Sequence, residues 1–113
     1  MRQAWSRTRF DMGWEMDWPF DDPKNTATFT VRQIVREGHP ILRVTHDSDD
    51  GAWQFLEWGT PRDEDAMIVG LGQMTRIDPS ILELADLPLG WCAIRRTAAE
   101  PWLRQPNGAD EGE

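Results

Sequence analysis

Hydrophobic and polar residues alternate with period two in the central part of this chain. Leu42 and Val44 alternate with Arg43 and Thr45, and residues 53–58 alternate with large apolar groups on both sides. This period, in segments rich in β-branched and aromatic residues, is typical of β-strands. The acidic run between the two segments ends in an Asp-Gly pair, and glycine tolerates the positive φ that turns need. The pattern therefore predicts a β-hairpin.

Similar patterns before and after this hairpin predict the rest of the fold. A strand that begins near residue 27 joins the hairpin in an antiparallel meander over 27–58. In Asp78-Pro79-Ser80, the Asp can cap a helix and the Pro suits its first turn. We therefore expect an α+β fold, with an antiparallel sheet of four or five strands and one or two short helices on one face. The further strands lie near 66–71 and 91–97, and the helices at about 72–77 and 79–86.

The chain divides into an arm, one domain and a tail. Residues 1–24 form the arm, 25–104 the single α+β domain, and 105–113 an acidic tail whose composition predicts disorder. We expect the first ten residues to be disordered, or natural translation to begin at Met12. The arm is rich in Trp over residues 5–20, and this segment either docks on the core or binds a partner.

Charge and cysteine content narrow the function classes. The 113 residues carry a net charge of −8, with 20 acidic and 12 basic residues. Direct binding to nucleic acid requires clustered Lys and Arg, so we expect no nucleic-acid partner and no anionic membrane surface. A basic protein partner fits this charge, and so does simple solubility. The single cysteine, Cys92, cannot form an intrachain disulfide and fits a cytoplasmic location.

No motif in the chain carries recognisable catalytic chemistry. A phosphate-binding glycine loop, a nucleophile elbow and a dinucleotide fingerprint are all missing from the sequence. The acidic run from Asp47 to Gly51 fails as a calcium loop, because Ala52 stands at loop position six and Trp58 at position twelve. We therefore expect a non-enzymatic protein without a cofactor or metal.

Two acidic loops with tryptophans between them provide the candidate contact residues. Acidic side chains on a protein surface steer basic partners toward it. If both loops fall at one end of the sheet, their carboxylates form one contact rim. The candidate residues are Asp47, Asp49, Asp50, Trp53, Trp58, Asp63, Glu64 and Asp65.

A second hypothesis is a small-molecule- or metal-binding protein. It uses the two histidines, His39 and His46, together with Cys92 and the adjacent pair Arg95 and Arg96. Zinc binding would require the fold to bring both histidines together with Cys92 or a carboxylate, since no local spacing does so. The arginine pair could hold a carboxylate or a phosphate, or it could balance nearby acids.

Three segments resemble a family of small acidic bacterial proteins of unknown function, part of which is described as immunity-protein-like. The resemblance covers residues 25–104 and lies in the segments 51–56, 65–69 and 78–91. The motifs that carry the resemblance are structural: a strand that contains Trp53, a helix that starts with Pro79, and the entry into a strand at Gly90-Trp91. The resemblance implies a cytoplasmic bacterial protein that blocks a toxin. It assigns no site residues.

Overall fold

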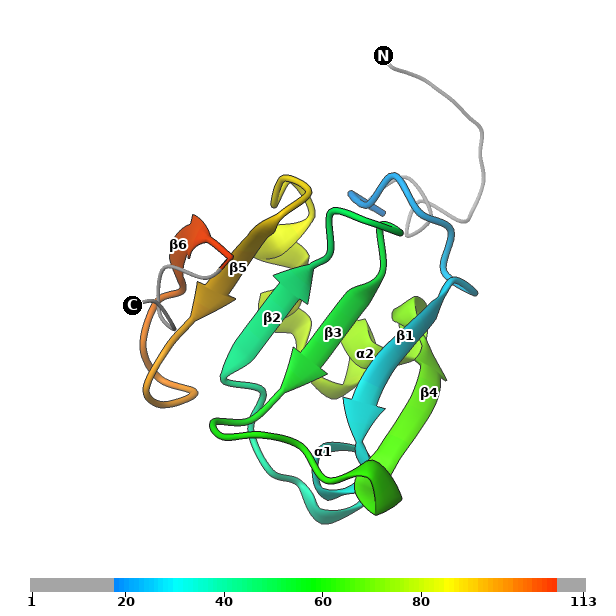
Figure 1. The fold of residues 1–113 in the computed structure, drawn as a ribbon, viewed down its shortest axis with the longest axis vertical. Coiled ribbons are helices and arrows are strands. Elements are labelled where there is room, and N and C mark those ends of the chain that lie inside the picture. Colours follow the sequence, from blue (N-terminus) through cyan, green and yellow to red (C-terminus); the bar gives the residue numbers. More distant parts are fainter. Residues whose placement is uncertain (1–17, 108–113) are drawn as a thin grey trace, which may run out of the picture.

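The computed structural model describes residues 18–107, which form one sheet with short helices. Its six strands lie in the order β4-β1-β3-β2-β5-β6 (Figure 1). The elements in chain order are β1 (Ala27–Val31), α1 (Arg32–Glu37), β2 (Arg43–His46), β3 (Trp53–Leu56), η2 (Asp63–Asp65), β4 (Ala66–Gly70), α2 (Leu71–Ile77), η3 (Pro79–Leu84), β5 (Trp91–Ile94) and β6 (Leu103–Pro106).

The fold is α+β, but its sheet differs from the expected antiparallel sheet of four or five strands. The sheet has six strands and is mixed, because β1 pairs with β3 in parallel while the other neighbouring pairs are antiparallel. The additional strand is β6, which the sequence pattern did not reveal. Its four residues include Arg104 and Pro106 and show little apolar alternation.

The predicted meander over 27–58 is wrong in its first strand. β1 ends at Val31, and the next six residues form α1, which buries Ile34 and ends at Gly38 with a φ of 75°. Because this helix follows β1, β2 does not pair with β1. β3 lies next to β1 instead, and β2 lies on the far side of β3 (Figure 1). Glycine relieves the steric cost of the left-handed conformation that ends such a helix.

The predicted hairpin is confirmed. β2 and β3 pair antiparallel with Val44 opposite Phe55, and Gly51 in the turn has a φ of 74°. The turn closes through two backbone bonds: Asp47 N–H donates to Ala52 O at 2.8 Å, and Gly51 N–H donates to Asp47 O at 3.0 Å. The sequence predicts this element well because strand alternation and turn chemistry are both local.

Helices cover one face of the sheet. α2 and η3 occupy the two segments where short helices were expected, and Figure 1 shows them behind the strands. Asp78 caps η3 as predicted, since its Oδ1 accepts from Ser80 N–H at 3.0 Å. Buried side chains from both helices and from the strands form one core; they are Val44, Trp53, Phe55, Leu71, Met74, Ile81, Leu84, Leu87 and Ala93, with Phe20, Val31, Ile34 and Ile41.

Part of the N-terminal arm packs on this core. Phe20 is buried, and its ring meets the Trp53 ring edge-on at 5.3 Å. Trp18 packs beside it, and its Nε1–H donates to Asp22 O at 2.8 Å. The expectations for the first ten residues, for Met12 and for the Trp-rich segment before residue 18 lie outside the described residues, as do residues 108–113 of the expected tail. Gln105 and Pro106, which were expected to belong to that disordered tail, are part of β6 instead.

Candidate functional site

The face of the sheet opposite the helices is the candidate site. Strand alternation and register place one row of side chains across all six strands of this face: Ile68, Phe29, Gln54, Thr45, Cys92 and Gln105. We call it the uncovered face because no helix within residues 18–107 packs on it, although Thr45 and Cys92 are buried. Ile68 and Phe29 stand opposite each other on β4 and β1, and they are 59% and 45% exposed. Two large apolar side chains are therefore adjacent on the surface.

β1 has the reverse of the expected polarity. It buries Thr28 and Thr30 against the helical layer and exposes Phe29. The buried hydroxyls lose no hydrogen bonds, because Thr28 Oγ1 donates to Val69 O at 2.7 Å and Thr30 Oγ1 donates to Phe55 O at 2.7 Å. Hydrophobicity alone would bury Phe29, so the packing of the helices on the opposite face decides its position.

A groove of ≈ 530 Å³ crosses the uncovered face beside this pair. The floor carries polar side chains from β2 and β3, and the loop from Gly59 to Pro61 forms one wall. Gln54 Nε2 donates to Asp47 Oδ2 at 2.8 Å, which fixes both side chains at one end of the groove. The other lining residues are Arg43, Thr45, Leu56 and Asn107.

Two buried polar atoms belong to the same row of the sheet. Within residues 18–107, neither Thr45 Oγ1 nor Gln105 Nε2 has a hydrogen-bond partner. A buried polar atom without a partner costs about 1–3 kcal/mol. Both atoms are buried, so they offer no hydrogen bond to a partner on this face.

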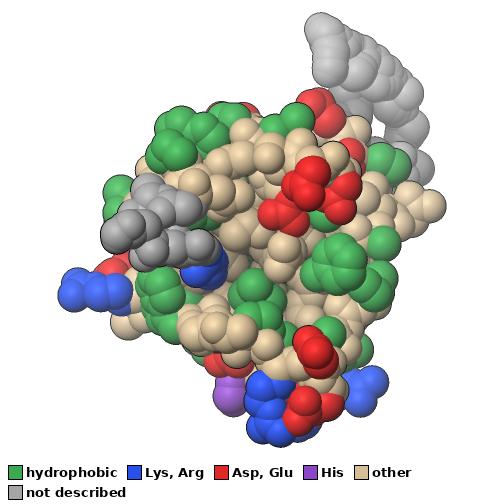
Figure 2. All heavy atoms as spheres, viewed as in Figure 1, with side chains coloured by type: hydrophobic (Ala, Val, Ile, Leu, Met, Phe, Trp, Pro, Cys, Tyr) green, Lys and Arg blue, Asp and Glu red, His purple; other side chains and the backbone are tan. Residues whose placement is uncertain are grey.

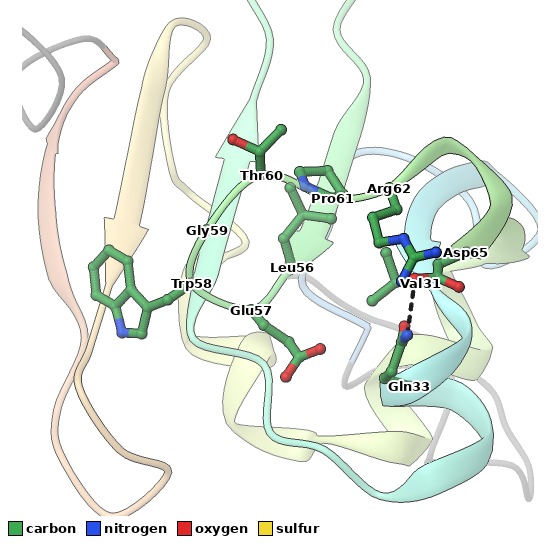
Figure 3. Close-up of a pocket in the computed structure, with 10 residues that line it drawn as sticks. All are labelled: Val31, Gln33, Leu56, Glu57, Trp58, Gly59, Thr60, Pro61, Arg62 and Asp65. Carbon is green, nitrogen blue, oxygen red and sulfur yellow. Dashed lines mark hydrogen bonds between the residues drawn. The ribbon is translucent and has the colours of Figure 1, made fainter.

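A smaller hollow of ≈ 110 Å³ lies on the other side of the 59–61 loop. Figure 3 shows Gln33 pointing toward Asp65, and Trp58 extending away from both toward β5. Asp65 is buried and accepts from Gln33 Nε2 at 2.9 Å and from Arg32 Nε at 2.8 Å. The hydrogen bond from Gln33, with the bond and charge of Arg32, lowers the pKa of Asp65 although burial opposes this shift.

The two acidic loops lie at opposite ends of the sheet. Asp47, Asp49 and Asp50 precede β3 in the hairpin turn, whereas Asp63 and Glu64 follow it in η2. Figure 2 shows acidic side chains gathered over the β2–β3 turn and again near η2. They therefore do not form the single rim that the sequence suggested, because the length of β3 separates them. The hairpin end is acidic, whereas at the η2 end Glu64 pairs with Arg62 and Asp65 with Arg32.

Three other sequence candidates take different positions. Trp53 is buried at the centre of the core, where its Nε1–H donates to Asp22 Oδ2 at 3.0 Å. Asp65 is also buried, so neither residue offers contact surface. Trp58 is 46% exposed, and it remains a candidate for contact with a partner.

The histidines and the cysteine of the second hypothesis do not converge. His39 is exposed, with Nδ1 at 2.9 Å from Glu57 Oε1, while His46 stacks on Trp53 at 3.9 Å and bonds Leu87 O through Nδ1 at 2.8 Å. Cys92 is buried on β5. Within the described part of the chain, no three His, Cys, Asp or Glu side chains are grouped so that they could hold a metal ion.

The two arginines of that hypothesis have different environments. Arg95 is a buried structural residue: its Nη2 donates to Asp78 Oδ2 at 2.7 Å, its Nε to Ile41 O at 3.0 Å, and its guanidinium stacks on Trp102 at 3.9 Å. Arg96 is exposed and pairs with Glu100 at 3.1 Å. The described contacts of Arg95 therefore anchor η3 and the segment after β5 to the sheet.

Comparison with known proteins gives no assignment. No family model, no curated protein and no solved structure matches this chain. Among the helices within residues 18–107, none has the length and apolar character needed to span a membrane.

Proposed function

We propose that this chain is a non-enzymatic protein-binding domain, which contacts a basic partner through the uncovered face of its sheet. The observation that carries this proposal is the reversed polarity of β1, which exposes Phe29 while it buries Thr28 and Thr30. Exposed apolar patches bordered by polar residues mark interaction sites on proteins. Ile68 stands opposite Phe29 on β4, and Trp58 is a further exposed apolar side chain.

The charges around this face favour a basic partner. Asp47, Asp49 and Asp50 lie at one end of the face, and Asp63 and Glu64 lie at the other (Figure 2). A partner that lies across the sheet would meet both groups, and the acids would steer its approach. An immunity-type inhibitor of a basic bacterial toxin needs such a surface, and the net charge of −8 supports this proposal.

Capture from the lysate of the native cell, followed by mass spectrometry, tests the proposal. We expect one dominant basic protein at low salt, with much less at high salt because salt screens the steering charges. Asp49→Asn/Asp50→Asn should slow association and weaken its salt dependence, while Phe29→Thr should weaken binding by at least about 1 kcal/mol, as for a contact at the centre of an interface.

Matched variants on the helical layer control for charge and surface hydrophobicity. Glu83→Gln/Asp86→Asn also removes two exposed carboxylates, and Leu82→Thr also replaces an exposed apolar residue. Both controls should bind as the wild type does. Equal binding by the Asp49/Asp50 and Phe29 variants, with each variant folded by circular dichroism, would assign the contact to another surface.

A further inference from the structure

The two edge strands of the sheet differ in how they are protected. β6 carries Arg104 and Pro106, and a proline in an edge strand removes a backbone donor. β4 consists of Ala-Met-Ile-Val-Gly, without a charge or a proline, and forms the opposite edge (Figure 1). An uncharged edge strand without proline is a template for pairing with another strand.

The hydrogen-bond pattern shows which backbone groups of β4 face outward. Leu71 N–H donates to Thr26 O at 2.8 Å, so the position Thr26–Leu71 is a bonded one in the β1–β4 ladder. Bonded and non-bonded pairs alternate along an antiparallel ladder, so the Phe29–Ile68 pair is non-bonded. The N–H and C=O of Ile68 therefore point away from β1, toward the edge on which no strand within residues 18–107 pairs.

We infer that β4 pairs antiparallel with β4 of a second copy of this chain, about a two-fold axis at Ile68. Each Ile68 then exchanges both backbone bonds with Ile68 of the other copy, and the two sheets become one continuous sheet. The Ala66 N–H is already used within η2, where it donates to Asp63 O, so the pairing is centred on Ile68. Such an interface is isologous and closes at two copies.

Side chains and charges favour a second copy as the occupant. The antiparallel arrangement joins the Phe29–Ile68 pairs of both copies into one apolar stripe, which covers part of Ile68. Lys24 lies at the Gly70 end of β4, since its carbonyl accepts from Gly72 N–H at 2.8 Å. Asp63 lies at the other end, where Glu64 pairs with Arg62. The two-fold axis therefore places the end with Asp63 of each copy near the end with Lys24 of the other.

Light scattering coupled to size-exclusion chromatography tests this pairing on the full chain. We expect a mass of twice 13.1 kDa for the wild type at high concentration, and a mass of 13.1 kDa for Ile68→Lys. Leu103→Lys is the matched control: Leu103 is 60% exposed and lies on the other edge strand, so this variant should keep the doubled mass. A wild type that stays monomeric, or an Ile68→Lys variant that keeps the doubled mass, would overturn the inference.

Hydrogen exchange on the wild type gives a measurement that does not depend on the folding of a variant. The Ile68 amide points outward from the fold, so its exchange should slow as the protein concentration rises and the dimer forms. An Ile68 amide that exchanges at the same rate in a sample with the doubled mass would place the dimer interface elsewhere.

Discussion

Replacing Arg95 by alanine should destabilise the fold more than replacing any other residue of the described ion pairs. The Arg95 side chain is 3% exposed, and its hydrogen-bond partners lie in three chain segments: at Ile41, at residues 78–80 and at Ala98. Its guanidinium donates to Asp78, Ser80, Ile41 O and Ala98 O. Truncation therefore removes one cation and leaves several acceptors without their donor.

The expected cost can be worked out from these contacts. Removing one partner of a buried ion pair costs about 3–5 kcal/mol, because the other charge stays behind without compensation. The Asp78 side chain is 21% exposed, so water can partly replace the guanidinium, which favours the lower part of that range. The Ile41 carbonyl and the stacking on Trp102 add to the loss. We expect a decrease of about 3–4 kcal/mol in the free energy of unfolding.

Urea unfolding followed by circular dichroism measures this decrease, with the slope on urea checked for constancy. Arg96→Ala is the internal control, because the neighbouring Arg96 side chain is 83% exposed and its pair with Glu100 contributes at most about 1 kcal/mol. A double-mutant cycle with Asp78→Ala should give a coupling energy of about 1–3 kcal/mol. Equal costs for Arg95→Ala and Arg96→Ala would refute the assignment of Arg95 as the anchor.

Two further predictions concern residues whose positions the structure decides. The hydrogen bond from Gln33, followed by the bond and charge of Arg32, lowers the pKa of Asp65 in the folded state. The ionised carboxylate therefore stabilises the fold above about pH 4, and this stabilisation is lost as the pH falls through the lowered pKa. Asp65→Asn should remove that part of the acid destabilisation, and an unchanged acid limb in melting curves would contradict it. Trp53→Ala should lower the free energy of unfolding, measured with urea, by about 3–5 kcal/mol, whereas Trp58→Ala should lower it by about 0.5 kcal/mol because Trp58 is exposed. Similar decreases for both variants would contradict the placement of Trp53 in the core.

Local signals in the sequence predicted individual elements well. The β2–β3 hairpin follows from period-two alternation and an Asp-Gly turn, and η3 begins at Asp78 as the capping pattern predicted. These features depend on residues within a few positions of each other. The strand near 66–71 and the strand near 91–97 were also found, as β4 and β5.

The sequence pattern failed where strand pairing is non-local. The β-branched side chains in α1 favour a continuation of the strand before it. The segment is nevertheless a helix, which buries Ile34 and ends at Gly38 in the left-handed conformation. That short helix changes the neighbour of β1 from β2 to β3. β6 was missed because its pairing with β5 stabilises a segment with little strand pattern of its own.

The candidate site shows the same division. Composition and charge by themselves determined an acidic chain without a catalytic motif, with tryptophans and acidic loops as contact candidates. Only the tertiary structure decided that Trp53 and Asp65 are buried, that the acidic loops lie at opposite ends, and that Phe29 is exposed. The physical reason is that a strand has two equivalent faces until other elements cover one of them. Here α2 and η3 cover the face with Thr28 and Thr30, and the position of Phe29 on the surface follows from that packing.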